Sequence, residues 1–441
     1  MKHERPPAPA GAAAFLLACG ALAAFGACAA QTRDPPPAHP PFFDYRDEAP
    51  GRSHRILVED LPAPYATRSA GNGPRIVARP EGVVPRVPEG FRVNLFAGGF
   101  STPRVLRTAP GGDVFLAESG AGKIRVFRGI DPAGGPQQSG VFASGFRRPY
   151  GIAFYPPGED PRWIYVADSR AVWRMPYRKG QLQADTEPSL ILELPFPGGH
   201  WTRDIRFSAD GATMYVAVGS ASNIDDPDTS ESEFRRADIL AASPEGAGLR
   251  IHAAGLRNAS GLAIEPRSGR LWCVVNERDG LGDDLVPDYV TTVHEGGFYG
   301  WPWWYIGAHQ DPRHEGRHPE LAARTIVPDV LLQPHTAPLQ LEFYEGTRFP
   351  ARYRGDIFAT SHGSWNRSVR TGYEVLRVPL HQAGQTDGGY EDFMTGFVLP
   401  NGDVWGRPVG VAVASDGSLL VSDDESGSVW RVDFVGTSER K

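Results

Sequence analysis

Residues 203–220 read RDIRFSADGATMYVAVGS, and this stretch decides the fold. Two apolar runs, IRF and MYVAV, stand on either side of the polar segment SADGAT. Apolar side chains at alternate positions are typical of a strand with one buried face. An Asp-Gly pair between two such runs favours a tight turn. The stretch therefore predicts an antiparallel β-hairpin.

Five further segments carry the same pattern of strand, turn and strand, at residues 104–128, 150–175, 260–277, 339–363 and 409–432. Antiparallel units repeated along one chain favour a β-propeller, because radial closure leaves only short edges exposed. The sequence thus predicts an all-β fold, a six-bladed β-propeller spanning residues 91–441. The widest gap between copies, residues 278–334, predicts an inserted loop system between blades four and five. Function usually goes with such insertions.

The first 30 residues have the pattern of a targeting segment, with the basic start MKHER followed by the apolar run GAAAFLLACGALAAFGACAA. Cys19 and Cys28 each follow Ala, in LLAC and FGAC, which resembles the cleavage box of a bacterial lipoprotein. A plain export signal and a simple membrane anchor are the alternatives. We therefore expect a periplasmic or extracellular protein, with or without membrane attachment through an N-terminal lipid.

Residues 31–90 are rich in proline, as in PPPAHPPF (35–42) and PEGVVPRVPEG (80–90). Such a composition predicts a leader or linker rather than a domain. The segment SHRILVED (53–60) leaves two interpretations open, because it could be part of a tether or an outer strand of the propeller.

The composition is that of a soluble globular protein, with 22% charged and 41% apolar residues and a formal net charge of −7. This balance argues against a nucleic-acid-binding protein, which usually shows a basic patch. Outside the targeting segment, Cys273 is the one cysteine, and its place in the apolar run LWCVV predicts a buried thiol without a disulfide. The chain has no motif for binding NAD or a nucleotide, and no common hydrolase motif.

His200 follows two glycines in PGGHWTRDIRF (197–207), at the start of a predicted blade. Glycines at this place let the backbone turn and leave room for a ligand. Histidine exchanges a proton near neutral pH and therefore suits a general base. The alternative is a histidine whose ring is hydrogen-bonded to a loop carbonyl.

Cationic and amide side chains stand at the corresponding place in other blades: Arg257 and Asn258 in GLRNASG, Arg407 in GRPVG, and His362, Asn366 and Arg367 in TSHGSWNR. Guanidinium and amide donors suit an anionic ligand that is rich in oxygen. Each could instead form a salt bridge between blades. Because blade starts converge on the mouth of a propeller, we expect an anionic cofactor there.

The loop NERDGLGDDLVPDY (276–289) is strongly acidic. Calcium binds carboxylate and carbonyl oxygens, which Asp279, Asp283 and Asp284 could supply. The loop does not have the EF-hand register, because Leu281 would occupy the third position if Asp279 held the first. A solvated turn and the rim of an active site are the alternatives.

Together, GGHWTRDIRFSADG, GLRNASGLA, NERDGLGDDL, GGFYGWP and RPVGVAVASDGSLLVSDD resemble the glucose/sorbosone dehydrogenase family, most closely its L-sorbosone dehydrogenase-like branch. The resemblance covers roughly residues 90–435. It implies a six-bladed propeller that oxidises sugars or sugar aldehydes in the periplasm with pyrroloquinoline quinone (PQQ) and calcium.

The resemblance also assigns roles to residues. It implies that His200 is the base and that Arg257 and Asn258 hold the polar edge of the quinone, with Arg257 stabilising charge on it. It places calcium at the backbone carbonyls of Arg278 and Asp279, next to the acidic pair Asp283 and Asp284. Arg407 matches the first of two late arginines, and the family's late lysine falls near His362.

Three positions depart from the family pattern. Ser220 stands where glucose-oxidising members have an aspartate, Val409 replaces the second late arginine, and His362 or a neighbour replaces the lysine. A rebuilt cofactor clamp would use His335, Asn366 and Arg367.

Two functions remain open on this basis. One is a PQQ- and calcium-dependent sugar dehydrogenase that passes electrons to a periplasmic acceptor. The other is a non-catalytic exported propeller that binds a carbohydrate or a protein. A propeller hydrolase is less favoured, because it would bring carboxylates from several blades to the central channel, whereas this chain has one acidic loop.

Overall fold

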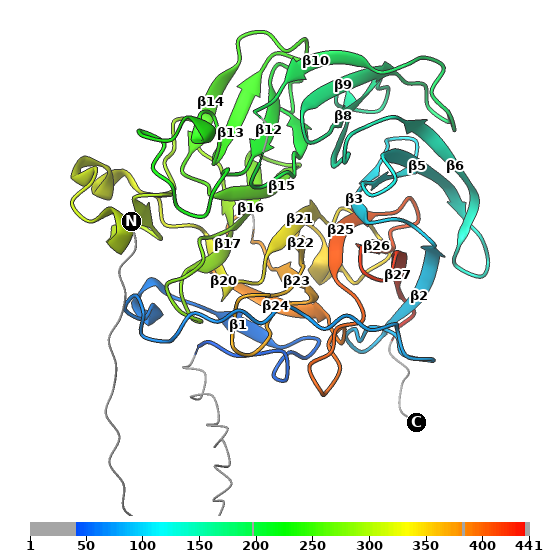
Figure 1. Cartoon of the computed structure of the whole chain (residues 1–441). Coiled ribbons are helices and arrows are strands. Elements are labelled where there is room, and N and C mark those ends of the chain that lie inside the picture. The colour runs from blue at the N-terminus through cyan, green and yellow to red at the C-terminus, as the bar shows by residue number, and fades with distance from the viewer. Residues whose placement is uncertain (1–40, 196–197, 382–383, 437–441) are drawn as a thin grey trace, which may run out of the picture. The chain divides into compact units, whose positions relative to one another are not determined.

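The fold is that of a computed structural model, which describes residues 41–195, 198–381 and 384–436. Six of their sheets are arranged around an axis as the blades of a β-propeller, and a seventh, two-stranded sheet lies in an insertion (Figure 1). The helices in the described residues are short 3-10 segments of three to six residues. The predicted all-β, six-bladed fold class is therefore confirmed.

Each blade is an antiparallel sheet, and its first strand contacts the first strands of the two neighbouring blades, so these strands surround the axis. Blade one comprises Pro103–Thr108 (β3), Val114–Glu118 (β4), Lys123–Ile130 (β5) and Pro136–Ser144 (β6). Blade two comprises Gly151–Tyr155 (β7), Trp163–Ala167 (β8), Ala171–Pro176 (β9) and Ser189–Glu193 (β10). Blade three comprises Ile205–Phe207 (β11), Met214–Val218 (β12), Asp238–Ala242 (β13) and Arg250–Ala254 (β14). Blade four comprises Asn258–Ile264 (β15), Leu271–Asn276 (β16), Pro287–Thr292 (β17) and Val330–Pro334 (β20). Blade five comprises Pro338–Phe343 (β21), Ile357–Ser361 (β22), Glu374–Val378 (β23) and Gly389–Met394 (β24). Blade six comprises Pro408–Val413 (β25), Leu419–Asp423 (β26), Ser428–Phe434 (β27) and Phe91–Gly98 (β2).

Blade six is completed by a strand from the other end of the propeller sequence. Strand β2 precedes blade one in the chain, yet it pairs antiparallel with β27, with Phe91 opposite Phe434 and Gly98 opposite Ser428. This pairing closes the ring and covers the outer edge of the last blade.

The Pro-rich leader lies against the propeller. Ser53–Arg55 (β1) pairs with β24 as a fifth strand of blade five, and Val58–Asp60 forms a 3-10 turn. Single β-bridges join Ile76 to Val404 and Arg86 to Thr395. The outer-strand interpretation of residues 53–60 therefore holds for the first part of that segment. The predicted targeting segment, with Cys19 and Cys28, lies outside the described residues.

The predicted insertion belongs to blade four. Residues 293–329 leave the sheet after β17 and return at β20, and they contain the two-stranded sheet Trp304–Tyr305 (β18) and His309–Gln310 (β19) and the 3-10 segments Pro312–His314 and Pro319–Arg324. The predicted boundaries, 278–334 between blades four and five, were thus too wide, because they included the two outer strands of blade four. These strands, PDYVTT and VLLQP, are separated by the insertion and do not form a contiguous hairpin.

The apolar core lies between neighbouring blades. Blades one and two, for example, pack Val105 and Phe115 against Ile152 and Ile164, all of them inaccessible to solvent. Cys273 is a free, buried thiol, as predicted. Among the described residues, no helix has the length and apolar character needed to cross a membrane.

Candidate active site

A cavity of about 530 Å³ lies at the mouth of the propeller where the inner strands begin. It is lined from blades one, three, four, five and six, and the segments between strands bring most of the lining side chains there. The cavity brings together eight of the predicted site residues: His200, Arg257, Asn258, Asp279, His335, His362, Asn366 and Arg407. Arg257, Asn258 and Arg407, which stand where inner strands begin, thus converge on this mouth, and His362, Asn366 and Asp279 reach it from the ends of second strands.

His200 reaches the cavity through a tight turn. Gly198 and Gly199 both have positive φ, +97° and +60°, and a Cβ on Gly199 would overlap the backbone of Ala221. The imidazole Nδ1 lies 3.0 Å from the carbonyl oxygen of Ser220 and 3.1 Å from its hydroxyl. Because a carbonyl only accepts, Nδ1 carries the proton and Nε2 carries the lone pair. Nε2 makes no hydrogen bond to the residues that the structure describes.

The charge state of His200 follows from its surroundings. Burial, together with the nearby Arg257 guanidinium, lowers its pKa from 6.5 to about 3. No carboxylate offsets these effects at Nδ1, because Ser220 occupies that place. His200 is therefore a neutral imidazole at physiological pH.

Arg257 is held by one carboxylate and several oxygens. It donates to Asp279 at 3.0 Å, to the side chain of Asn223 at 2.9 Å and to the carbonyl of Glu277 at 2.6 Å. Burial alone would raise the pKa of Asp279, but Arg257 and its other partners lower it to about 2. The guanidinium is thus fixed at the cavity wall with its charge largely compensated.

Asn366 connects this ion pair to His335. Its amide donates to Asp279 at 2.5 Å and to Nδ1 of His335 at 3.0 Å, and Nε2 of His335 donates to the carbonyl of Gly282 at 3.0 Å. His335 has a positive φ of 67°. A non-glycine residue in this region costs free energy and is found where the surroundings fix the side chain for a function. The cluster orients Asp279 toward Arg257.

The opposite wall carries a second charge cluster. Asp424 lies 2.8 Å from Nε2 of His362 and 3.2 Å from Arg104, and Arg407 donates to the carbonyl of His362 at 3.1 Å. Burial and the cations nearby lower the pKa of His362 to about 4, so its ring is neutral and donates through Nε2. Arg104 and Arg407 thus supply cationic donors at this wall, with the carboxylates of Asp424 and Glu425 close to them.

Four predicted residues do not line the cavity. Arg278 pairs with Asp311 at 3.1 Å, and Asp284 forms a buried ion pair with Arg367 at 2.6 Å. The carboxylate of Asp283 accepts from the backbone of Ser368 at 3.1 Å. The structure thus places Arg278, Asp283, Asp284 and Arg367 behind the cavity wall, where they hold the acidic loop.

Trp365 of the TSHGSWNR segment also lines the cavity, together with residues that the sequence did not single out: Arg104, Trp201, Asn223, Glu277 and Asp288. Arg104 had a usable signal, because it starts the first repeat as Arg257 and Arg407 start later ones. Asn223 had none, since it lies in a loop without a repeated pattern.

The donor set fits a planar, polycarboxylated quinone such as PQQ. Arg104, Arg257 and Arg407 supply cationic donors, Trp201 and Trp365 supply aromatic surface, and Oδ1 of Asn258 is buried without a hydrogen-bond partner in the described chain. In the described ranges, no three His, Cys, Asp or Glu side chains are placed to hold one metal ion.

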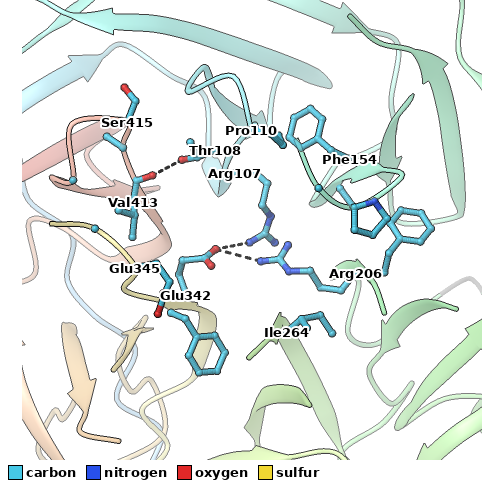
Figure 2. A pocket seen from close by; sticks show the side chains of 18 of the residues that line it. Arg107, Thr108, Pro110, Phe154, Arg206, Ile264, Glu342, Glu345, Val413 and Ser415 are labelled. Carbon is cyan, nitrogen blue, oxygen red and sulfur yellow. Dashed lines mark hydrogen bonds and ion pairs between the residues drawn. The ribbon is translucent and has the colours of Figure 1, made fainter. Parts of the chain in front are cut away.

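The other mouth of the channel is different. A cavity of about 600 Å³ lies where the inner strands end, and Figure 2 shows Arg107 and Arg206 pointing at Glu342 inside it. Their distances to the carboxylate are 3.1 and 3.3 Å, and Arg107 also pairs with the buried Asp204. None of the predicted site residues lines this cavity, and Arg107 and Arg206 are engaged by the carboxylate of Glu342.

The propeller fold is shared with solved structures of sugar dehydrogenases, among them the PQQ domain of a pyranose dehydrogenase and a PQQ-bound aldose sugar dehydrogenase. The chain belongs to the TrAA12-like family, whose profile matches residues 85–295 and 309–434. The predicted resemblance to the PQQ-dependent sugar dehydrogenase superfamily is confirmed. The assignment to the sorbosone branch stays a prediction.

Individual relatives are distant. A protein of Borreliella burgdorferi described as uncharacterized is 26% identical over 361 residues, which cover 79% of this chain and 90% of that protein. The PQQ-dependent pyranose dehydrogenase of Coprinopsis cinerea is 25% identical over 406 residues, covering 78% of this chain and 54% of the relative. The chain thus spans about half the length of that dehydrogenase.

Solved structures support the fold. The holo form of the PQQ domain of the Coprinopsis cinerea pyranose dehydrogenase superposes with a TM-score of 0.67 at 23% identity, covering 81% of this chain and 98% of that domain. A calcium structure of a family AA12 enzyme from Trichoderma reesei has a TM-score of 0.66 at 20% identity, covering 79% and 97%. At these identities the likeness establishes the fold alone.

Proposed function

We propose that this chain is a quinoprotein oxidoreductase that oxidises a sugar or a sugar aldehyde, with PQQ bound in the cavity at the start of the inner strands. The observation that supports this most is the placement of His200. Its Nε2, which has no hydrogen-bond partner among the described residues, shares one cavity with Arg257, Asn258 and Arg407. A base and a set of anion-binding donors are thus within reach of one small ligand.

His200 is the group that takes the proton. Its Nε2 accepts the hydroxyl proton of the alcohol or hydrated aldehyde, while the carbonyl of Ser220 holds the proton on Nδ1. PQQ, when bound, supplies the electrophilic carbon that accepts the hydride. Neutralisation of Arg257 by a bound polyanion would raise the pKa of His200 toward that of an efficient base.

The arginines bind and orient. Arg257, fixed by Asp279 and Asn223, is placed to stabilise negative charge that develops on a bound quinone. Arg104 and Arg407, which share Asp424 as a nearby carboxylate, would hold carboxylates at the opposite wall.

We propose that calcium also binds, but at backbone carbonyls rather than at carboxylates. Because the carboxylates of Asp279 and Asp284 are engaged by arginines, calcium would depend on backbone carbonyls, as at Arg278 and Asp279. The carbonyl of Asp279 already accepts from Asn223 at 2.9 Å, so a cation there would share it with that amide.

The export of the protein is also a proposal. The targeting segment predicts a periplasmic or extracellular enzyme with a periplasmic electron acceptor, and lipidation at Cys19 or Cys28 would attach it to the membrane. Metabolic labelling with a fatty acid, compared between the wild type and the Cys→Ser variants, tests this attachment.

Absorbance titration with PQQ tests the catalytic proposal, with calcium and with a chelator in parallel. We expect binding at micromolar PQQ and reduction of a dye when an aldose or sorbosone is added. His200→Ala should still bind PQQ but lose dye reduction, and Arg407→Ala should bind PQQ more weakly. The absence of PQQ binding under both metal conditions would refute the proposal.

A second candidate is a non-catalytic propeller that binds a carbohydrate or a protein. Two observations favour it: the partner of His200 is the uncharged Ser220, and Val409 is fully buried within β25. On this hypothesis, His200→Ala leaves ligand binding intact and the wild type shows no turnover in the presence of PQQ.

A further inference from the structure

A separate groove lies on blade three, next to the insertion of blade four. It has a volume of about 840 Å³, within the usual ~300–1,000 Å³ of small-molecule sites. One side is the loop of residues 227–238 between β12 and β13, and the other includes Phe298, Trp301 and Trp303 of the insertion. We call it the blade-three groove.

Aromatic side chains from both sides line this groove. Phe298 and Trp303 lie 6.2 Å apart with their rings inclined by only 35°, and Phe234 on the loop is 68% exposed. One exposed aromatic ring is ordinary on a protein surface. Phe234 on the loop and the half-buried Trp303 on the insertion supply aromatic surface on both sides of the groove for the apolar face of a ligand, with the buried Phe298 packed beside Trp303.

Asp238 at the start of β13 is the unusual polar group of the groove. The residue is 5% exposed and lines the groove, yet its carboxyl makes no hydrogen bond or ion pair with the described residues. Burial, reinforced by Glu233, raises its pKa well above the usual value. A buried polar group without a partner costs free energy, which a ligand able to hydrogen-bond would recover.

The loop is fixed in place and carries backbone strain. Arg235 and Ala237 both have a φ of 55°, and such strain collects at functional sites. Between them, Arg236 donates to the carbonyls of Gly219 at 2.9 Å and His200 at 2.8 Å. Arg236 therefore lies between the groove and the cavity that holds His200, and the two are separate.

These features select one ligand chemistry. An apolar ligand would cover the rings but leave Asp238 without a partner. A small anion is disfavoured because the acidic lining residues, Asp228, Glu231, Glu233 and Asp238, outnumber the two arginines, Arg235 and Arg236. A pyranose ring combines an apolar C–H face with hydroxyl groups that both donate and accept, so it matches the rings and the carboxyl together.

We infer that the blade-three groove is a second carbohydrate-binding site, separate from the cavity of His200, that holds units of an oligosaccharide. The inference rests on the rings and on Asp238, and it does not depend on PQQ chemistry in the central cavity.

Isothermal titration of the full chain, without added PQQ, with cellohexaose, xylohexaose and maltohexaose tests the inference. Phe234→Ala and Asp238→Ala should raise the Kd for a bound hexasaccharide by about tenfold, the effect of losing a stacking or hydrogen-bonding partner. Tyr65→Ala, which removes an aromatic ring of similar exposure (61%), is the matched control and should not change it. His200→Ala should not change it either.

Thermal unfolding separates a binding role from a structural one. Because the carboxyl of Asp238 is unpartnered, Asp238→Ala should keep or raise the Tm while it weakens binding. The inference is overturned if none of the three hexasaccharides binds, if Phe234→Ala binds as the wild type does, or if His200→Ala abolishes binding. Dye reduction is measured in a separate experiment, so a failure of the catalytic proposal does not change how the oligosaccharide-binding result is interpreted.

Discussion

His200 is oriented by a residue that carries no charge. The carbonyl and hydroxyl of Ser220 both lie close to Nδ1, at 3.0 and 3.1 Å. They fix the tautomer as a carboxylate would, but an uncharged carbonyl and hydroxyl stabilise an imidazolium less than a carboxylate does. Ser220 therefore fixes which ring nitrogen of His200 carries the proton, but it raises the pKa of His200 less than a carboxylate would.

In the Ser220→Asp variant, the new carboxylate should both fix the tautomer of His200 and raise its pKa. A carboxylate beside Nδ1 favours the charged ring, so the pKa of His200 should rise from about 3 toward neutrality. The acid limb of dye reduction should move to higher pH by the same amount. Histidine side-chain NMR over a pH series measures the pKa without relying on turnover.

The control is Ser220→Ala, which keeps the carbonyl and should keep the low pKa. The direction in which folding stability changes with pH follows from the same pKa of His200. The wild-type pKa in the folded state lies below the unfolded value of 6.5, so stability is fully present above about pH 6.5 and is lost as the pH falls toward 3. Identical titration curves for the Asp and Ala variants would contradict this account.

Asp283 and Asp284 are adjacent in sequence but differ in environment. Asp284 is paired with Arg367 inside the protein, with side-chain exposures of 4% and 3%, whereas Asp283 is partly exposed and accepts from the backbone of Ser368. Asp284→Ala should cost about 3–5 kcal/mol, because it leaves a buried charge unpaired. Asp283→Ala should cost about 1 kcal/mol.

Guanidinium unfolding of both variants, with and without calcium, measures the difference. If the two carboxylates were instead calcium ligands, both variants would lose the same calcium-dependent stabilisation. Equal losses would therefore count against the structural role of the Asp284–Arg367 pair.

At the scale of elements, strand β2 closes the ring, since it pairs along its length with β27. A chain that starts at residue 99 lacks β2, whereas one that starts at residue 89 keeps it. We expect the shorter chain to lose cooperative unfolding and to associate, because the edge of β27 and the gap between blades become exposed. Size-exclusion chromatography and near-UV circular dichroism compare the two chains, and equal behaviour would show that closure by β2 is dispensable.

The repeated hairpins made the blades predictable, because alternation within each strand depends on local sequence. The convergence of Arg257, Asn258 and Arg407 was predictable for the same reason, as each stands where an inner strand begins. Two kinds of feature were not. The pairing of β1 with β24 joins segments far apart in the chain, and the partner of Asp284 is Arg367, which no spacing within the acidic loop indicates.

The whole ring is held at its axis by buried polar side chains. Gln340 on β21 is inaccessible to solvent, and its amide bonds both backbone groups of Leu106 in β3 and of Val411 in β25. Asp204 similarly accepts from the backbone of Leu262 in β15 and pairs with Arg107. Inner strands have no further strand to pair with, so these side chains satisfy their free edges.

Gln340→Leu should therefore destabilise the whole propeller. Four backbone groups in two other blades lose their partners in a place that water cannot easily reach, so we expect a loss of about 4 kcal/mol. Gln333→Leu is the matched control, because the backbone groups that this buried glutamine bonds belong to Phe43 and Pro41 of the leader, at 3.2 and 3.3 Å, and its other partner is the side chain of Tyr390. Its loss should be about 1 kcal/mol, since the leader can turn to solvent. Denaturant unfolding followed by tryptophan fluorescence compares the variants. A loss for Gln340→Leu no larger than that for Gln333→Leu would mean that packing between the blades, and not the polar axis, holds the ring together.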